Sequence, residues 1–446
     1  MTDTADHTAS SRDAGARLLA RVWSEIGGDP DRLVGVAPPP VAPPLPSRLA
    51  TGSLAWAGVA AATLAAGRDA RRLDPDRIAL AYRSDRVLTV DGSTPPVWSP
   101  LSGFWRTVDG WIRTHGNYPH HAAALCAGLA LDPSADAEVV RSVLQDLHTD
   151  DAVAAISATG GLAVPVRRED RVVDAALRRT PVVAVERIDV DAEPRAIARS
   201  DDDLPLRGIR ILDLTRVIAG PMATRTLALF GADVLRLDPP GLPEPEWQHL
   251  DTGHGKRSAL LDARSDRMHD LLAEADAVVL GYRPAAIQRL GLAPDALARR
   301  HPGIVVAQLS AWGTDDPHRA GFDSLVQAES GIALAESSDG STPAALPAQA
   351  LDHTAGYLLA AAIASVLDHR RTRGGSWVVR TSLRRVAAEL LGMPRRRMPA
   401  AETRVDATPH VAGFRVGGSD IVTARPAIPG FEFRPPRPWA SDQPCW

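Results

Sequence analysis

Lysine, cysteine and net charge are scarce in this sequence. Of the 50 basic residues one is a lysine, Lys256, and arginine takes the other positions. The two cysteines, Cys126 and Cys445, lie far apart and form no disulfide framework, so we expect a reducing, cytoplasmic setting. A net charge of -4 gives no electrostatic basis for binding nucleic acid or an anionic membrane surface.

Long apolar runs are also lacking. No run approaches the roughly 20 residues that a membrane-spanning helix needs, so the sequence predicts no span. The N-terminus, MTDTADHTAS, is polar and acidic, unlike a signal peptide or a basic transit peptide. With 446 residues, 45% of them hydrophobic, we expect a globular protein of two or three domains.

The first two hundred residues predict a helix and linker (1–50) followed by a smaller α+β region (51–200). Proline-rich residues 36–46 favour an extended linker. Residues 103–115 alternate aromatic and polar side chains around an Asp-Gly pair, which is typical of a β-hairpin. Further helices are expected at 14–26, 54–66, 122–130, 137–147 and 150–158, and a short strand at 87–91.

Residues 201–392 predict a different architecture. Short apolar strands are expected at 209–214, 233–237, 277–280 and 304–308, with helices between them. This alternation favours an α/β fold with a doubly wound, mostly parallel sheet. Ligands bind such sheets at the carboxyl ends of the strands, so the loops after these strands should surround one cleft. Residues 393–446 show little periodicity, and we expect an irregular tail that covers a partner subunit or is partly disordered.

Six stretches in this region resemble class III CoA-transferases, the family of formyl-CoA and carnitine CoA-transferases and of acyl-CoA racemases. They keep the order and spacing of that family over about 180 residues. The stretches are LPLRGIRILDLTRVIAGPMATRTLALFGADVLRLDPP, GHGKRSALLD, GYRPAAIQRLGL, HPGIVVAQLSAWG, AGFDSLVQAESG and SSDGSTPAALPAQALDHTAGYLLAAAIASVL.

The resemblance implies a Rossmann-like CoA-binding domain. Coenzyme A would be a co-substrate, with no bound cofactor or metal, and acyl-CoA and a carboxylic acid would be the small-molecule partners of a homodimer. The expected CoA-binding residues are Ile218, Ala219, Gly220, Lys256, Arg257, Arg283, Arg289, Ala311 and Trp312. Where the family has an arginine after the second strand, this chain has Pro239, so one CoA contact is missing or supplied from elsewhere.

The resemblance also implies a catalytic carboxylate. In the transferases an aspartate before a glycine attacks the thioester and forms an aspartyl-CoA intermediate, which is covalent catalysis. Asp339 of SSDGS aligns with that nucleophile, although Asp-Gly also favours a simple turn. The glycine-rich loop that covers this intermediate in the family has no clear counterpart after Ser382.

Other functions stay open. Racemases of this fold use a His/Asp pair, but Phe322 stands where the histidine before Asp323 is expected, and Asp352 fills the aspartate position in both classes. A CoA-binding subunit without activity is a third possibility. A dinucleotide-dependent dehydrogenase is disfavoured because no G-x-G-x-x-G follows the first strand.

The order of the domains is unusual for this family. Residues 102–129 and 156–173 resemble its small domain, yet they precede the large one, which indicates a rearranged member. Three histidines lie there, His115, His120 and His121, and their loop predicts either a hydrogen-bonded structure or a metal site. Trp98 and its neighbouring tryptophans are expected to pack in a core or between domains.

Overall fold

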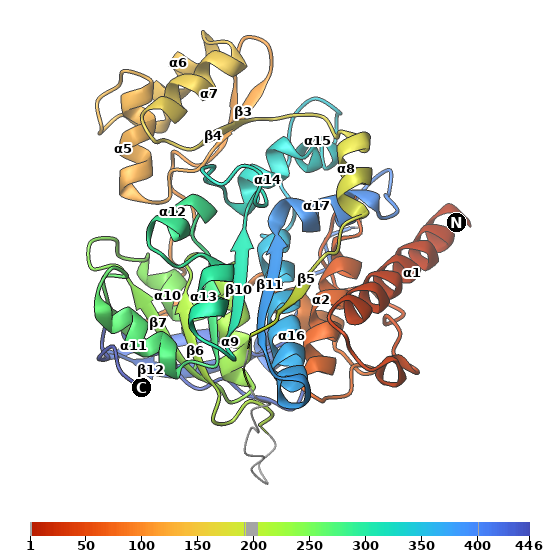
Figure 1. Ribbon diagram of the computed structural model, residues 1–446. Helices are drawn as coiled ribbons and strands as arrows, with labels where there is room; N and C mark the ends of the chain where they lie inside the picture. The colour runs from red at the N-terminus through yellow and green to blue at the C-terminus, as the bar shows by residue number, and fades with distance from the viewer. Residues whose placement is uncertain (1, 191, 193–203, 400) are drawn as a thin grey trace.

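The computed structural model describes residues 2–190, 192, 204–399 and 401–446. Figure 1 shows a large part built around one sheet and a smaller part above it. The sheet has seven strands in the order β5-β11-β10-β9-β6-β7-β8, and all neighbours run parallel except β5, which is antiparallel to β11. Its strands are β5 Ala184–Ile188, β6 Arg210–Leu214, β7 Asp233–Asp238, β8 Arg257–Leu260, β9 Ala277–Leu280, β10 Val305–Ser310 and β11 Ser376–Ser382.

The chain reverses its direction across the sheet between β6 and β9. From β6 it proceeds to β7 and β8 on one side, and then returns to place β9, β10 and β11 on the other. At such a switch point the loops that follow the two central strands diverge and leave a crevice at the carboxyl end of the sheet. The amide of Gly281 still donates to the carbonyl of Leu214 at 3.1 Å, so these two loops begin side by side.

Helices cover both faces of the sheet, as the alternating strand residues require. Ile211 packs with one hydrophobic cluster and the next residue, Leu212, with the other. The first face carries α1 Thr2–Glu25, α2 Thr51–Ala65, α9 Ala219–Leu229, α16 Ala350–Arg373 and α17 Leu383–Gly392. The second carries α11 Asp266–Glu274, α12 Pro284–Arg289 and α13 Pro294–Arg300. The mixed α/β class with a mostly parallel sheet is thus confirmed.

In the described part of the chain, one helix has the length and composition of a membrane span. This helix, α16, meets both criteria, contrary to the sequence-based expectation, because its charged residues lie near its two ends and leave a long apolar stretch between them. In the structure, 94% of its apolar window is buried inside the protein, and it packs between α2 and α9. Its apolar side chains therefore form part of the hydrophobic core.

The smaller part is an antiparallel sheet with helices. The hairpin predicted at 103–115 is confirmed by the pairing of Trp105 with Ile112. The elements are β2 Phe104–Arg106, β3 Trp111–Thr114, β4 Ala163–Pro165, α5 Pro119–Gly128, α6 Ala137–Gln145 and α7 Thr149–Ala158. Its hydrophobic cluster is separate from that of the large sheet. Residues 101–163 therefore form a small unit, which Figure 1 shows above the carboxyl ends of the strands.

The N-terminal segment packs differently from the expectation. Helix α2 was expected within the smaller α+β region, but it lies on α16 and shares the hydrophobic cluster of the large sheet. Almost all of its 15 residues are apolar and buried, so the helix must pack against apolar neighbours on every side. Helix α16 covers one of these sides. The predicted domain boundary at residue 50 stays a prediction. In the structure, α2 packs with the large part of the molecule.

The C-terminal segment is not an irregular tail. Residues 411–424 form a hairpin, β12 Val411–Val416 and β13 Ser419–Ala424, which pairs with β1 Thr89–Val90. The residues after it run along β8 of the same chain, where the amide of Asp442 donates to the carbonyl of Ser258 at 2.8 Å. The remaining short helices are η1 Pro30–Leu33, α3 Pro75–Tyr82, α4 Ser84–Val87, α8 Arg171–Arg178, α10 Glu246–Thr252, α14 Asp323–Glu329, α15 Ile332–Ala335 and η2 Thr408–His410.

Candidate active site

The loop after β6 holds the first three predicted CoA residues. Ile218 is partly exposed, whereas Ala219 and Gly220 are buried at the start of α9. A Cβ on Gly220 would lie 2.3 Å from the Cβ of Thr215, so a side chain there is excluded by the loop's own fold. Of the three, the side chain of Ile218 has the most room to meet a ligand at the switch point.

Two further predicted positions follow β9. Arg283 is exposed at the N-terminal end of α12 and contacts the carbonyl of His318 at 3.4 Å, and Arg289 is exposed in the last turn of that helix. The amide of Ala285 donates to the carbonyl of Pro317 at 2.9 Å, which ties this loop to the one after β10. Both guanidinium groups are placed where an anion could reach them from solvent.

The loop after β10 contributes Ala311 and Trp312, both partly buried. The indole N–H of Trp312 donates to the carbonyl of Ala320 at 3.0 Å, and the guanidinium of Arg319 lies 3.8 Å from the centre of a Trp312 ring. A cavity of about 380 Å³ opens beside this tryptophan, with Arg168 and Arg384 in its wall. The structure therefore brings Ile218, Arg283, Ala311 and Trp312 to the carboxyl end of the sheet.

Lys256 and Arg257 are not part of that group. Lys256 is 3% exposed at the amino end of β8, and its Nζ donates to Asp213 and to the carbonyl of Pro221, both at 2.9 Å. Burial lowers the pKa of Lys256 to about 8, although Asp213 opposes this. Arg257 pairs with Asp233 and donates to the carbonyl of Cys445. Each is engaged by the protein's own groups, and their assignment as CoA contacts stays a prediction.

Asp339 lies in an exposed loop after α15, and its carboxylate is held by that loop. Oδ1 accepts the amides of Ser341 and Thr342 at 2.7 Å and the hydroxyl of Ser337 at 3.0 Å, and Oδ2 accepts the hydroxyl of Thr342 at 2.7 Å. These donors hold the pKa of Asp339 well below its usual range. The carboxylate is therefore ionised and fixed in one orientation, and its assignment as nucleophile stays a prediction.

The small unit meets the carboxyl end of the sheet through aromatic rings. His115 stacks on Phe322, with ring centres 3.9 Å apart and planes 1° apart, and His121 lies 6.0 Å from the same ring. Burial lowers the pKa of His115 to about 3 and that of His121 to about 4, so both are neutral at pH 7. Among the described residues the one group of three with metal-ligand spacing is Asp74, Asp76 and His410, so these histidines form no metal cluster.

Two buried carboxyl groups lie directly behind Phe322. Asp323 is fully buried at the start of α14 and accepts from the amide of Asp352 at 2.9 Å and from the amide group of Gln327. Burial raises the pKa of Asp323 to about 6, and burial together with Asp323 raises that of Asp352 further. The pair can hold a proton near neutral pH, which is a property of acid–base groups.

An ionic network that sequence reasoning missed connects the loop after β6 to the small unit. Glu244, fully buried, accepts from Nε of Arg216 at 2.7 Å, from the amide of Val217 at 2.9 Å and from the hydroxyl of Tyr118 at 3.2 Å. Burial opposes ionisation of Glu244, but Arg236 and Arg216 hold its pKa below the usual value. Glu244 falls in a proline-rich loop sequence, GLPEPEW, which carries no signal of this role.

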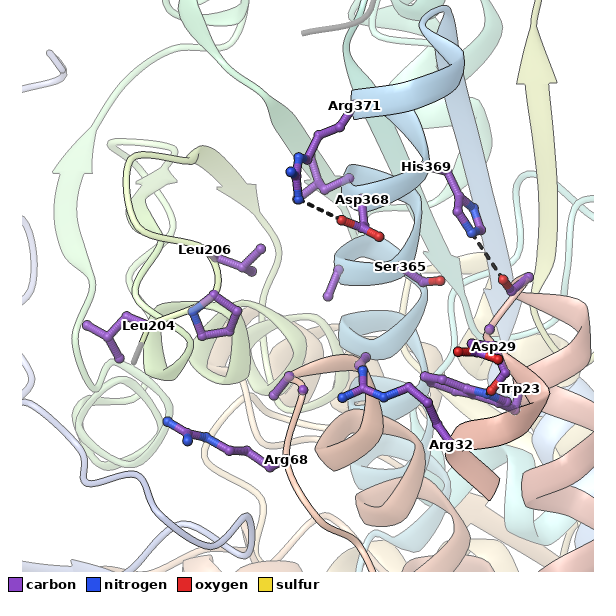
Figure 2. A pocket seen from close by; sticks show the side chains of 18 of the residues that line it. Trp23, Asp29, Arg32, Arg68, Leu204, Leu206, Ser365, Asp368, His369 and Arg371 are labelled. Carbon is purple, nitrogen blue, oxygen red and sulfur yellow. Dashed lines mark hydrogen bonds and ion pairs between the residues drawn. The ribbon is translucent and has the colours of Figure 1, made fainter. Parts of the chain in front are cut away.

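A larger cavity lies elsewhere. Figure 2 shows this space of about 620 Å³ between the N-terminal segment, residues 204–207 and the C-terminal end of α16. Arg371 pairs there with Asp368 at 2.9 Å, and the imidazole of His369 lies 3.1 Å from the carbonyl of Gly27. None of the predicted site residues lines it, so it is not the candidate site.

Comparison with known proteins finds a family match in the central region. The model of CoA-transferase family III matches residues 206–415. We refer to these matched residues as the family III segment. It begins just before β6 and extends into β12, so it contains the switch-point loops, Asp339 and the Asp323–Asp352 pair.

Curated relatives of the family III segment carry transferase names. A probable fatty acyl-CoA transferase of Mycobacterium tuberculosis is 33% identical over 205 residues, 42% of this chain and 52% of that protein. A formyl-CoA:oxalate CoA-transferase of Streptomyces coelicolor is 30% identical over 42% of this chain and 49% of its own length. A crystal structure of a Mycobacterium tuberculosis protein matches 42% of this chain with 33% identity and a TM-score of 0.40. The chain thus spans about half the length of the curated relatives it matches.

Proposed function

We propose that this protein is a CoA-transferase that moves CoA from an acyl-CoA to a carboxylic acid through an aspartyl intermediate on Asp339. The match of residues 206–415 to CoA-transferase family III carries the proposal, together with relatives that are named as acyl-CoA, formyl-CoA and succinyl-CoA transferases. The same resemblance is the basis for inferring a Rossmann-like CoA site and a cytoplasmic homodimer.

The proposed reaction balances around one carboxylate. Asp339 attacks the thioester carbonyl, CoA thiolate leaves, and a mixed anhydride forms. The thiolate then attacks the aspartyl carbonyl, which releases the first acid with one oxygen from Asp339 and leaves an aspartyl-CoA thioester. The acceptor carboxylate repeats these steps in reverse, takes CoA and returns one of its own oxygens to Asp339. Neither a metal nor a redox cofactor takes part in this sequence.

The predicted CoA-binding residues and Asp339 have separate roles in this proposal. Ile218 and the start of α9 would border the pantetheine arm, and the exposed Arg283 and Arg289 would meet its phosphates. The five donors around Asp339, which include the hydroxyl of Ser341 at 3.0 Å, keep it ionised, which a nucleophile requires before it attacks. They also lower its reactivity in the free state, so acyl-CoA binding would have to release some of these hydrogen bonds.

Trapping of the intermediate tests the proposal. The protein is incubated with a panel of acyl-CoAs and hydroxylamine, and intact-mass and peptide mass spectrometry locate any hydroxamate. We expect a hydroxamate on Asp339 that the Asp339→Ala variant lacks. Asp132→Ala is the matched control, because Asp132 is also exposed and accepts a backbone amide and a hydroxyl of its own turn. No adduct in the presence of measurable CoA binding would contradict the proposal.

A second candidate function rests on the buried carboxyl pair. Asp323 and Asp352 hold a proton near neutral pH, and this favours proton transfer next to a thioester carbonyl in an acyl-CoA isomerase or racemase. Exchange of the α-hydrogen of an acyl-CoA with solvent deuterium, lost in Asp352→Asn but kept in Asp339→Ala, would support this function over CoA transfer.

A further inference from the structure

Arg113 is a buried cation in the small unit. It lies on β3 opposite Phe104 of β2, and its side chain is mostly enclosed, with the residue 8% exposed. The guanidinium carbon lies 4.8 Å from the centre of the Phe104 ring and 5.0 Å from that of a Trp98 ring. Aromatic faces attract a cation, but they accept none of its five N–H groups as a carboxylate does.

The guanidinium lacks an anionic partner in the described part of the chain. The structure gives it no hydrogen bond and no ion pair there, and its Nε is buried without an acceptor. Burial lowers the pKa of Arg113 to about 10, an unusual state for an arginine. The charge of Asp323 acts on Arg113 through space, but the two oxygens of Asp323 accept hydrogen bonds from Asp352 and Gln327 and none from Arg113. A buried guanidinium with an unsatisfied Nε–H favours the binding of an anionic group beside it.

The surroundings of Arg113 connect it to the carboxyl end of the sheet. Phe104 packs in the same apolar cluster as Phe322 and Trp312, between β4 and α14. His115, two residues further along β3 and its following loop, stacks on Phe322, and its Nδ1 is also buried without a partner. Arg113 and His115 therefore lie near the junction between the small unit and the candidate active site.

We propose that Arg113 binds a carboxylate of a small dicarboxylic acid, either as the free acid or as its CoA thioester. The planar fork of a guanidinium matches a carboxylate with two parallel hydrogen bonds, and the aromatic rings leave the alkyl chain an apolar path. This inference deepens the proposed function, since it names the class of acid that the transferase would use. Arg113 is thus a specificity-determining residue of the small unit.

Ligand binding without turnover tests the inference. Glutarate and butyrate are compared by calorimetry and by thermal shift on the wild type, on Arg113→Met and on Arg113→Lys. We expect the wild type to bind glutarate, Arg113→Met to bind it about 10- to 100-fold more weakly, and Arg113→Lys to recover part of the loss. Butyrate should show no dependence on Arg113. Arg106→Gln is the matched control, because Arg106 also lies over a tryptophan, Trp111, but is exposed.

The unliganded stability distinguishes a binding role from a structural one. If Arg113 awaits a ligand, Arg113→Met removes an unpaired buried charge and keeps or raises the melting temperature. A melting temperature lowered by several degrees, with no glutarate-dependent shift in the wild type, would overturn the inference. Failure of CoA transfer would leave it standing, since binding of the free acid needs neither CoA nor Asp339.

A comparison of thioesters separates the two forms of the ligand. If the carboxylate arrives on the acyl chain, glutaryl-CoA should bind more tightly than butyryl-CoA, and Arg113→Met should remove this difference. If it arrives as the free acceptor, the two thioesters should bind equally in both proteins while glutarate keeps its dependence on Arg113. If glutarate, butyrate, glutaryl-CoA and butyryl-CoA each bind equally to the wild type and to Arg113→Met, both forms of the ligand are contradicted.

Discussion

At the scale of single residues, burial and partners determine what a charged side chain does. The sequence singles out Lys256 because arginine replaced every other lysine, and the structure shows why a compact ammonium is used there. Its Nζ reaches Asp213 on β6 and the carbonyl of Pro221 on α9, both at 2.9 Å, in a space without solvent. The signal in the sequence was real, but it marked a buried ion pair that fixes the switch-point loop. The structure thus assigns Lys256 to the core.

This ion pair gives a stability prediction. Lys256→Met should lower the free energy of unfolding by about 3–5 kcal/mol, because it leaves the carboxylate of Asp213 buried without a counter-charge. Arg257→Gln, which breaks a partly exposed pair with Asp233, should cost less than about 1 kcal/mol. Chemical denaturation of both variants measures the difference. Equal losses would show that Lys256 lies in a more open environment than described.

The carboxyl pair gives a pH prediction. The folded pKa of Asp323, about 6, lies above its unfolded value, so the pair's contribution to stability is present below about pH 4 and is lost as pH rises through 6. Asp352→Asn removes an ionisable group, so the variant should gain about 1–3 kcal/mol relative to the wild type between pH 4 and pH 7. Denaturation at both pH values tests this, with Asp151→Asn on the surface as control. If the difference in stability between Asp352→Asn and the wild type is the same at pH 4 and pH 7, both carboxyl groups must be in contact with water.

At the scale of helices and strands, local sequence patterns predicted the elements that contacts between sequence neighbours stabilise. The strands around β6 and β9 and the hairpin of the small unit have regular alternation and near neighbours in sequence, and they were predicted close to their observed bounds. The hairpin β12–β13 was missed although its strands are neighbours in sequence and join at Gly417 and Gly418, because β12 is half exposed and shows weak apolar alternation. The pairing of β1 with β13 spans more than 300 residues and leaves no local pattern to read.

Close packing of α16 on α9 gives a prediction for these elements. A Cβ on Gly356 would lie 2.7 Å from the carbonyl oxygen of Ala219 and from Cβ of Met222. Gly356→Ala should therefore cost about 1–3 kcal/mol of stability and weaken CoA binding, since it displaces the start of α9. Gly413→Ala on β12, where the new Cβ would lie 3.9 Å from the carbonyl oxygen of Ile421, should change stability by less than about 1 kcal/mol.

Thermal denaturation and calorimetric titration with CoA measure these two effects. A Gly356→Ala protein with unchanged stability but weaker CoA binding would still place α9 at the CoA site. Unchanged stability and unchanged binding would contradict both the packing and the proposed site.

At the scale of the whole molecule, the family III segment is enclosed by parts that precede and follow it. Helices α1 and α2 cover α16, the small unit stands over the carboxyl end of the sheet, and residues 425–446 run along β8. The segment itself could be inferred from its motifs. The contacts of the enclosing parts could not, because they depend on surfaces that form only once the sheet is assembled.

The segment along β8 gives a prediction about association. Ala440 and Asp442 hydrogen-bond to Ser258 and cover an edge strand that would otherwise offer free backbone groups. A chain without residues 440–446 should associate beyond the state of the full chain, as light scattering would show. Trp446→Ala, which keeps the cover on β8, should not. A truncated chain that scatters like the full one would show that β8 needs no cover.

Tracing oxygen-18 from the acceptor acid tests most directly whether CoA transfer proceeds through Asp339. The protein is incubated with an acyl-CoA and a carboxylic acid labelled with oxygen-18, and the peptide that contains Asp339 is analysed by mass spectrometry. CoA transfer through Asp339 predicts that this carboxylate gains one heavy oxygen and passes it to the acid released in the next turnover. CoA transfer with unlabelled Asp339 would contradict the account and assign the reaction to another residue or to a direct exchange.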